Sequence, residues 1–135
     1  MIAYIQGTFD LYHTGHINLF KRAKKIADTV VVALLTDESI KKYRGKPPVI
    51  SYEDRYNAII SCVYVDVVMP SDPQNTKEQI LIVQPDFVVL GSDWAVKDIY
   101  KQYNCEREFL DKYLVYFPYT PHISSTLIKQ RINER

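Results

Sequence analysis

Apolar runs alternate with helical patterns along this 135-residue chain, and that alternation constrains its fold more than any other feature. The apolar runs are continuous and β-branched, as is typical of strands covered on both faces. We predict strands at 1–6, 29–35, 64–69, 86–90 and 113–117. Helices are predicted at about 16–27, 52–62, 76–84, 94–104 and 124–133. This pattern predicts a single α/β domain, a doubly wound parallel sheet of about five strands with helices on both faces.

The segment from Gly7 to His16 joins the first predicted strand to the first predicted helix. Ligands in doubly wound sheets bind beyond the carboxyl ends of the strands, and free N–H groups at a helix N-terminus favour anions. His13 and His16 are spaced to lie on one face of a helical turn, where both imidazoles can donate to one phosphate chain. A structural role for both histidines is one alternative. Metal binding is the other, although no cysteine and no convenient third histidine or carboxylate accompanies the pair.

Composition narrows the ligand class. A formal net charge of +1 argues against a dedicated nucleic-acid binder, which needs a concentrated basic face. We therefore expect a free nucleotide or a small phosphate as the ligand. No apolar run has the length needed to span a bilayer, and the N-terminus lacks the basic region and cleavage site of a signal peptide. Cys62 and Cys105 are expected to be free thiols in a reducing cytoplasm.

Gly7-Thr8-Phe9-Asp10 followed by His13-x-Gly15-His16 resembles the signature of the cytidylyltransferase-like nucleotidyltransferases. Within that superfamily the chain is similar, essentially end to end, to the small glycerol-3-phosphate cytidylyltransferases. A second specific match is Ile123-Ser124-Ser125-Thr126 before the last predicted helix. Supporting matches between the two are Thr36-Asp37-Glu38, Arg44-Gly45-Lys46, Tyr52-Glu53-x-Arg55, Tyr64-Val65-Asp66 and Gly91-Ser92-Asp93-Trp94.

The resemblance implies a Rossmann-like nucleotidyltransferase fold over residues 1–135. It also implies that CMP is transferred from CTP to a small phosphorylated or phosphonate acceptor, with release of pyrophosphate. Mg²⁺ would be bound mainly through the nucleotide phosphates, with no protein ligand to it predicted. A homodimer is expected from the resemblance alone.

The resemblance also assigns roles to individual residues. The catalytic set is His13, His16, Arg44 and Lys46. The nucleotide-binding set is Gly7, Thr8, Phe9, Asp10, Gly15, Arg55, Gly91, Asp93, Trp94, Thr120, Ile123, Ser124, Ser125 and Thr126. In this assignment the last three hold the β- and γ-phosphates at the N-terminus of the final helix. Asp93 accepts from a cytosine amino group, and Trp94 either stacks on the base or packs in the core.

Two basic features have simpler alternatives. We interpret residues 41–46 as a basic loop in which Arg44 and Lys46 reach the phosphates, although a charge run is often only a solvated face, as for Lys41 and Lys42. Arg55 either contacts the nucleotide or pairs locally with its acidic neighbours at positions 53 and 54.

Val63 and Tyr119 stand where relatives carry arginines. We hypothesise that Lys97, Tyr119 or His122 binds the acceptor instead, and that the acceptor differs from glycerol 3-phosphate. Two functional alternatives stay open. One is an adenylyltransferase that uses ATP on a sugar phosphate or flavin mononucleotide, and the other is a non-catalytic nucleotide-binding module.

Overall fold

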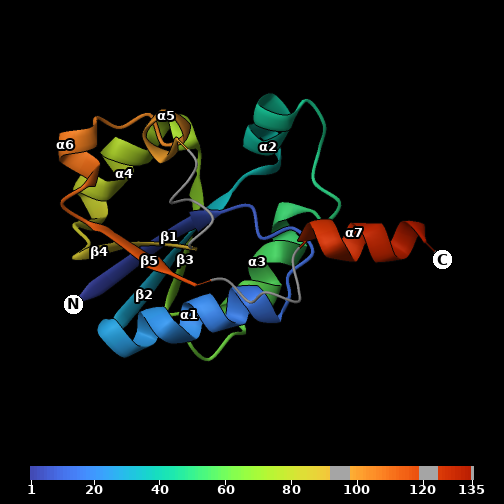
Figure 1. The fold of residues 1–135 in the computed structure, drawn as a ribbon, viewed down its shortest axis with the longest axis horizontal. Helices are drawn as coiled ribbons and strands as arrows, with labels where there is room; N and C mark the ends of the chain where they lie inside the picture. The colour runs from blue at the N-terminus through green and yellow to red at the C-terminus, as the bar shows by residue number, and fades with distance from the viewer. Residues whose placement is uncertain (92–97, 119–124, 135) are drawn as a thin grey trace.

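The computed structural model describes residues 1–91, 98–118 and 125–134. Five strands form one sheet, in which every paired neighbour runs parallel, in the order β3-β2-β1-β4-β5 (Figure 1). The strands are β1 (Ile2–Gly7), β2 (Thr29–Leu35), β3 (Val67–Ser71), β4 (Phe87–Gly91) and β5 (Leu114–Phe117). The predicted doubly wound parallel sheet is confirmed.

Helices cover both faces of this sheet. They are α1 (Thr14–Ile26), α2 (Asp37–Arg44), α3 (Tyr52–Ile60), the 3-10 helix η1 (Pro73–Asn75), α4 (Thr76–Val83), α5 (Ile99–Gln102), α6 (Arg107–Leu110) and α7 (Ser125–Asn133). Figure 1 shows α1 and α3 on one face and α4, α5 and α6 on the other, with α7 extending away from the rest.

Alternating side chains of the strands feed two hydrophobic clusters, one on each face. In β1, Ala3 and Ile5 pack with Phe20 of α1, whereas Tyr4 packs on the opposite face with Ile80 of α4. All five are at most 1% exposed. Burial on both faces explains why the strands read as continuous apolar runs rather than as an alternating pattern.

The order of the strands places a crevice beside β1. The chain proceeds outward from β1 to β2 and β3, and then returns to the other side of β1 as β4. Because β1 and β4 are parallel neighbours, their carboxyl ends at Gly7 and Gly91 lie on the same edge of the sheet. This reversal of strand order is the point at which doubly wound sheets bind ligands.

The third strand begins later than the 64–69 prediction. Val65 donates its N–H to the Cys62 carbonyl in a turn after α3, and the Asp66 carboxylate accepts from the Val30 N–H. The strand itself starts at Val67. Pairing with β2, rather than the apolar run alone, sets this boundary.

The prediction of a basic loop over residues 41–46 was wrong for its first four residues, which belong to α2. The Thr36 side chain caps this helix by accepting from the Ser39 N–H, and Gly45 ends it with φ of 80°. These are ordinary start and stop signals. The short helix α6 was not predicted, and of the helix predicted at 94–104 the described part is helical only over α5.

Candidate active site

His13 and His16 begin helix α1 as a reciprocal pair of caps. The Nδ1 atom of His13 accepts from the Gly15 N–H at 3.0 Å, and the N–H of His13 donates to Nδ1 of His16 at 3.1 Å. Two imidazoles thereby take the places of the serine and glutamate of a capping box. Since each Nδ1 is an acceptor, the proton of each neutral ring must lie on Nε2.

Packing keeps both rings neutral. The His13 and His16 rings stack with centroids 3.9 Å apart, Tyr12 stacks on the other side of His16 at 5.8 Å, and Phe9 meets it edge-on at 5.2 Å. Burial, with a smaller contribution from His13, lowers the pKa of His16 to about 3. Burial also lowers the pKa of His13. At neutral pH the pair offers two N–H donors without carrying positive charge.

Gly7 and Phe9 shape the backbone before these histidines. The Phe9 ring lies over Gly7, where an added Cβ would come within 2.9 Å of the Phe9 Cζ atom. Phe9 and Leu11 both adopt positive φ, at 48° and 53°. The Phe9 side chain is 7% exposed and belongs to the hydrophobic core. A contact from Phe9 to a nucleotide would therefore come from its backbone.

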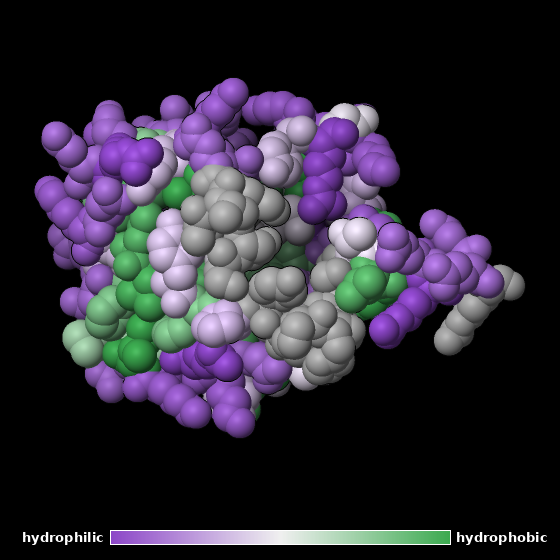
Figure 2. Space-filling view, in the orientation of Figure 1, coloured by the Kyte–Doolittle hydropathy of each residue, from purple (hydrophilic) through white to green (hydrophobic). Residues whose placement is uncertain are grey.

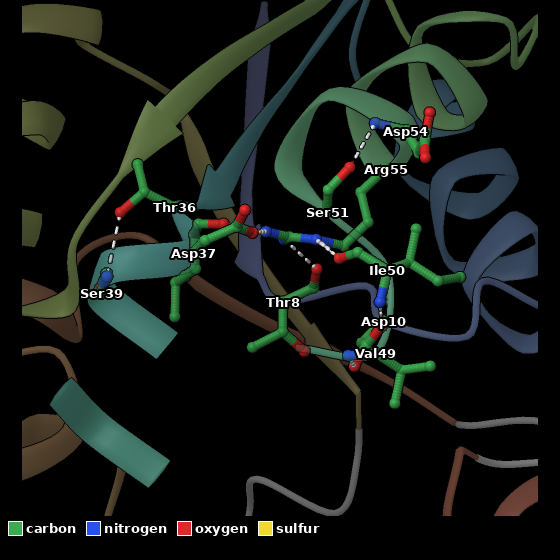
Figure 3. A network of polar contacts seen from close by, with 11 residues as sticks. Thr8, Asp10, Thr36, Asp37, Ser39, Val49, Ile50, Ser51, Asp54 and Arg55 are labelled. Atoms are coloured by element: carbon green, nitrogen blue, oxygen red, sulfur yellow. Dashed lines mark hydrogen bonds and ion pairs between the residues drawn. The ribbon is translucent and has the colours of Figure 1, made fainter. Parts of the chain in front are cut away.

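Asp10 holds a neighbouring segment in place. Its two carboxylate oxygens accept the backbone N–H groups of Val49 and Ile50 at 2.8 and 2.9 Å (Figure 3). The side chain is 3% exposed. The predicted contact between Asp10 and the nucleotide stays a prediction. We call residues 7–13 the histidine loop. The two hydrogen bonds of Asp10 attach this loop to the segment that precedes α3.

Arg55 is a buried clamp, 1% exposed, at the same place. Its guanidinium donates to the carbonyl oxygens of Ile50, Thr8 and Leu35 at 2.8–2.9 Å, and to the Asp37 carboxylate at 2.7 Å (Figure 3). The alternative that Arg55 pairs with its acidic neighbours in α3 was wrong, because its ion pair is formed with Asp37 in α2. The predicted nucleotide contact of Arg55 is untested, and its described donors point inward.

Arg44 reaches the histidine loop from the last turn of α2. Its Nη2 atom lies 3.4 Å from Oγ1 of Thr8 at an exposed position. Lys46 follows the helix-ending Gly45 and is exposed. The structure thus brings Arg44, Thr8 and the histidine pair to one edge of the sheet.

Several predicted residues lie outside the described residues, so their placement stays a prediction. These are Asp93, Trp94, Lys97, Tyr119, Thr120, His122, Ile123 and Ser124. Gly91 is the last residue of β4, one residue beyond the predicted end of that strand, and Ser125 and Thr126 open α7.

Val63 lies in the turn before β3, at the amino edge of the sheet, and is 81% exposed. The histidine loop is at the carboxyl edge. The absence of an arginine at this position therefore removes no donor from the site of the same chain.

Sequence reasoning missed several partners in this site. Asp37 was noted only as part of a supporting motif, and Leu35, Val49 and Ile50 carried no signal of their own because they contribute backbone groups. One signal was available: Thr8 comes just after β1 and the acidic Asp37 just after β2, so both lie at the edge of the sheet where Arg55 binds them.

Within the described ranges, no group of three or more His, Cys, Asp or Glu residues is arranged to hold a metal ion. No helix among the described residues is long and apolar enough to cross a membrane. Cys62 and Cys105 are free thiols, as predicted.

Comparison with known proteins gives concordant results. The chain is 40% identical over 127 residues to the glycerol-3-phosphate cytidylyltransferase of Bacillus subtilis, which covers 93% of this chain and 92% of that protein. It is 38% identical over 90 residues to the FAD synthase of Pyrococcus abyssi, covering 66% of this chain and 61% of that protein.

Among solved structures, the lipopolysaccharide core biosynthesis protein of Thermoplasma volcanium superposes with a TM-score of 0.73. It is 25% identical, and the match covers 89% of this chain and 98% of that chain. The model of the cytidylyltransferase-like family matches residues 4–131. With its histidine loop at the crevice of the sheet and relatives of this kind over nearly its whole length, the chain belongs to the cytidylyltransferase-like family.

Proposed function

We propose that this protein transfers CMP from CTP to a small phosphorylated acceptor. A phosphate oxygen of the acceptor attacks the α-phosphorus, a new P–O bond forms, and the bond to the β-phosphate oxygen breaks as pyrophosphate leaves. The observation that carries the proposal is the pair of Nε2–H donors from His13 and His16 at the crevice. The similarity to a glycerol-3-phosphate cytidylyltransferase supports the choice of substrates.

The histidine pair suits this chemistry because negative charge develops on the transferring phosphoryl group. Preorganised donors aimed at such charge lower the barrier, and removing one typically costs about 100- to 1,000-fold in rate. The caps hold both rings in place before substrate arrives. Arg44 adds a cation at the same edge.

Mg²⁺ is part of the proposal. When bound, it would neutralise charge on the triphosphate. Magnesium sites of this kind use substrate phosphates with one or two carboxylates, so they do not need a dedicated protein cage. The absence of a three-ligand cluster from the described ranges is compatible with such a site.

Phosphorus NMR of the reaction mixture tests the proposal. Protein, Mg²⁺ and CTP are incubated with glycerol 3-phosphate, polyol phosphates, phosphoethanolamine or phosphocholine. We expect pyrophosphate together with a new diphosphate-linked product. Stabilisation by CTP without pyrophosphate from any acceptor would instead support the nucleotide-binding module.

Variants of the histidine pair connect the activity to the geometry. His13→Asn keeps a side-chain oxygen that can cap α1 but removes the ring donor, so we expect kcat to fall by about 100-fold or more with the fold retained. Lys21→Gln on the exposed side of α1 is the matched control. Equal activity of His13→Asn and the control would contradict the assigned role.

The similarity to an FAD synthase favours one second candidate, transfer of AMP from ATP. Parallel reactions with ATP and flavin mononucleotide or a sugar phosphate distinguish the two. Product from ATP alone would replace the cytidylyl proposal.

A cytoplasmic homodimer completes the proposal. Free thiols at Cys62 and Cys105 suit a reducing compartment. Helix α7 extends from the domain with Ile132 60% exposed, and Figure 2 shows hydrophobic side chains on it. Light scattering after size-exclusion chromatography measures the mass, and a monomer at micromolar concentration would count against the dimer.

A further inference from the structure

The end of β1 is held by a strand on one side and by a side chain on the other. Pairing of β1 with β2 continues to Gly7, whereas its described pairing with β4 extends to Tyr4. The Ile2 carbonyl faces β4 and accepts a backbone N–H there at 2.8 Å. Because backbone groups alternate in direction along a strand, the Gln6 carbonyl faces the same side. It accepts a hydrogen bond from the hydroxyl group of Tyr103, 3.3 Å away.

Tyr103 is a buried donor at the end of α5. It is the C-cap residue of that helix, is 3% exposed and belongs to the same hydrophobic cluster as Tyr4. Burial raises the pKa of Tyr103, so its hydroxyl group keeps the proton that it donates. A buried tyrosine hydroxyl normally finds a hydrogen-bond partner. Here the partner is the carbonyl of the residue that precedes the histidine loop.

The side chain of Gln6 fixes the same point a second time. Its Nε2 atom donates to Ser71 Oγ at 2.6 Å, and its Oε1 atom accepts from Thr76 Oγ1 at 3.2 Å. Ser71 is the last residue of β3, and Thr76 is the first residue of α4. A buried amide that is bonded at both ends has one orientation. Gln6 is thus held through its backbone and through its side chain.

Gly7 lies between two carbonyl groups that distant side chains hold. The Gln6 carbonyl accepts from Tyr103, and the Thr8 carbonyl accepts from Arg55 at 2.8 Å. Arg55 belongs to α3, and Tyr103 follows α5, which covers the opposite face of the sheet (Figure 1). The histidine loop therefore starts from a backbone that is fixed from both faces.

A packing contact connects this starting point to the imidazole rings. The Phe9 ring lies over Gly7, at 2.9 Å from the position that an added Cβ would occupy. The same ring meets the His16 ring edge-on, with centroids 5.2 Å apart. A displacement of the backbone at residues 6–8 would therefore move the ring that His16 packs against, and His16 in turn caps the N–H of His13.

We propose that Tyr103 is a positioning residue for nucleotidyl transfer. Its hydroxyl group takes the place of β4 at the end of β1, and it thereby fixes where the histidine loop begins and where the two imidazole donors point. The inference rests on the proposed function. It goes beyond that function by giving a buried residue on the other face of the sheet a part in the reaction. A misplacement of reacting groups by about 1 Å can cost about 100-fold in rate.

Steady-state kinetics of Tyr103→Phe test the inference. This variant keeps the ring and removes only the hydroxyl group. We expect kcat to fall by about 10- to 100-fold with little change in KM for CTP, because the misplaced donors act on charge that develops in the transition state. Tyr100→Phe is the matched control, since it removes a hydroxyl group from α5 whose partner is the Asp111 carboxylate. We expect the control to keep the kcat of the parent protein.

The ring signals of the histidines give a readout that does not depend on turnover. Long-range proton–nitrogen correlation spectra report the tautomer and the hydrogen bonding of each imidazole. We expect the signals of His13 and His16 to shift in Tyr103→Phe and to stay in place in Tyr100→Phe. Circular dichroism verifies that both variants are folded at the temperature of the measurement. A folded protein that is only less stable would keep the parent signals.

Gln6→Met tests the second connection without leaving a hydroxyl group unpaired. In this variant the Ser71 hydroxyl keeps its bond to an α4 side chain, and the Thr76 hydroxyl keeps its bond to a carbonyl of η1, both at 2.9 Å. The backbone carbonyl at position 6 remains available to Tyr103. We therefore expect a smaller loss of kcat than in Tyr103→Phe. A larger loss would overturn the inference, because the Gln6 side chain would then be the positioning group.

Two results for the tyrosine variants would also overturn the inference. One is an equal kcat in Tyr103→Phe and Tyr100→Phe. The other is a fall in kcat with unmoved ring signals, since Tyr103 would then act elsewhere than through the histidine loop. If the parent protein transfers no nucleotide to any acceptor, the proposed function fails. The ring signals remain decisive in that case, because unmoved signals in Tyr103→Phe would show that Tyr103 does not position the imidazoles.

Discussion

The imidazole capping box makes a specific prediction about acid stability. His16 is neutral in the folded protein with a pKa of about 3, whereas an unfolded chain leaves it near its ordinary value of 6.5. As the pH falls below 6.5, the unfolded state takes up this proton first. The contribution of His16 to stability is therefore complete above pH 6.5 and is lost progressively as the pH falls toward the folded pKa.

The magnitude follows from these two values. At pH 7.5 the loss is below about 0.1 kcal/mol, and at pH 5 it reaches about 2 kcal/mol. Any folded pKa of 4 or lower gives nearly the same figure, since at pH 5 the folded ring is then almost fully neutral. The physical cause is the packing of the ring against Tyr12, Phe9 and His13, which excludes the water that would stabilise a charge.

The matched variant is His16→Gln. Glutamine at this helix position can accept from the N–H of His13 as in an ordinary capping box, but it does not titrate. Its unfolding free energy will be lower at every pH because the ring contacts are gone. The informative quantity is therefore the difference between pH 7.5 and pH 5 within each protein. His13 and His122 are present in both proteins and largely cancel.

Urea denaturation followed by circular dichroism measures this difference. We expect the parent protein to lose about 2 kcal/mol more than His16→Gln between pH 7.5 and pH 5. Equal losses would show that His16 accepts its proton without unfolding. In that case the ring would not be a fixed neutral donor, and the role assigned to the histidine pair would be wrong.

Three further substitutions test the positioning network by urea denaturation. Arg55→Met should cost about 3–5 kcal/mol, because it leaves three carbonyl groups without their donor and removes the ion pair with the half-exposed Asp37, whereas exposed Arg22→Met should cost under about 0.5 kcal/mol. A similar loss for both arginine variants would contradict the clamp. Asp10→Asn should cost about 1–3 kcal/mol, since its amide group faces a backbone N–H, and unchanged stability would show that these hydrogen bonds are dispensable. Gly7→Ala should cost about 1–3 kcal/mol through its contact with Phe9, and no loss would mean that the ring moves freely.

The sheet could be predicted from the sequence because strands buried on both faces are apolar at nearly every position. The predictions were less accurate for elements that lack such an apolar run or extend beyond it. Tyr64 and Val65 are apolar enough to extend the third strand, but turn hydrogen bonds and the position of Asp66 against Val30 exclude them from it. Helix α2 was missed because five of its eight residues carry charge, although Thr36 and Gly45 marked both of its ends.

Within the site, the local spacing of His13 and His16 predicted that the two rings lie together, and their stacking at 3.9 Å agrees with this. Their role as donors to a phosphate stays a prediction. The spacing was not enough to predict that the rings cap each other, since that depends on the extended conformation of His13. The partners of Asp10 are backbone N–H groups of Val49 and Ile50, about forty residues away along the chain, so the residues next to Asp10 in the sequence could not predict them.

Asp10 and Arg55 also show that charged residues of the family motifs can be engaged in contacts within the protein. Asp10 fixes the segment that enters α3, Arg55 returns from α3 to the Thr8 carbonyl, and the same guanidinium reaches Leu35 and Asp37 beside α2. These contacts join the ends of β1 and β2 to two helices. Arg44 and the imidazoles lie on that joined frame, so the distance between the cation and the two donors depends on buried residues that never need to touch a phosphate.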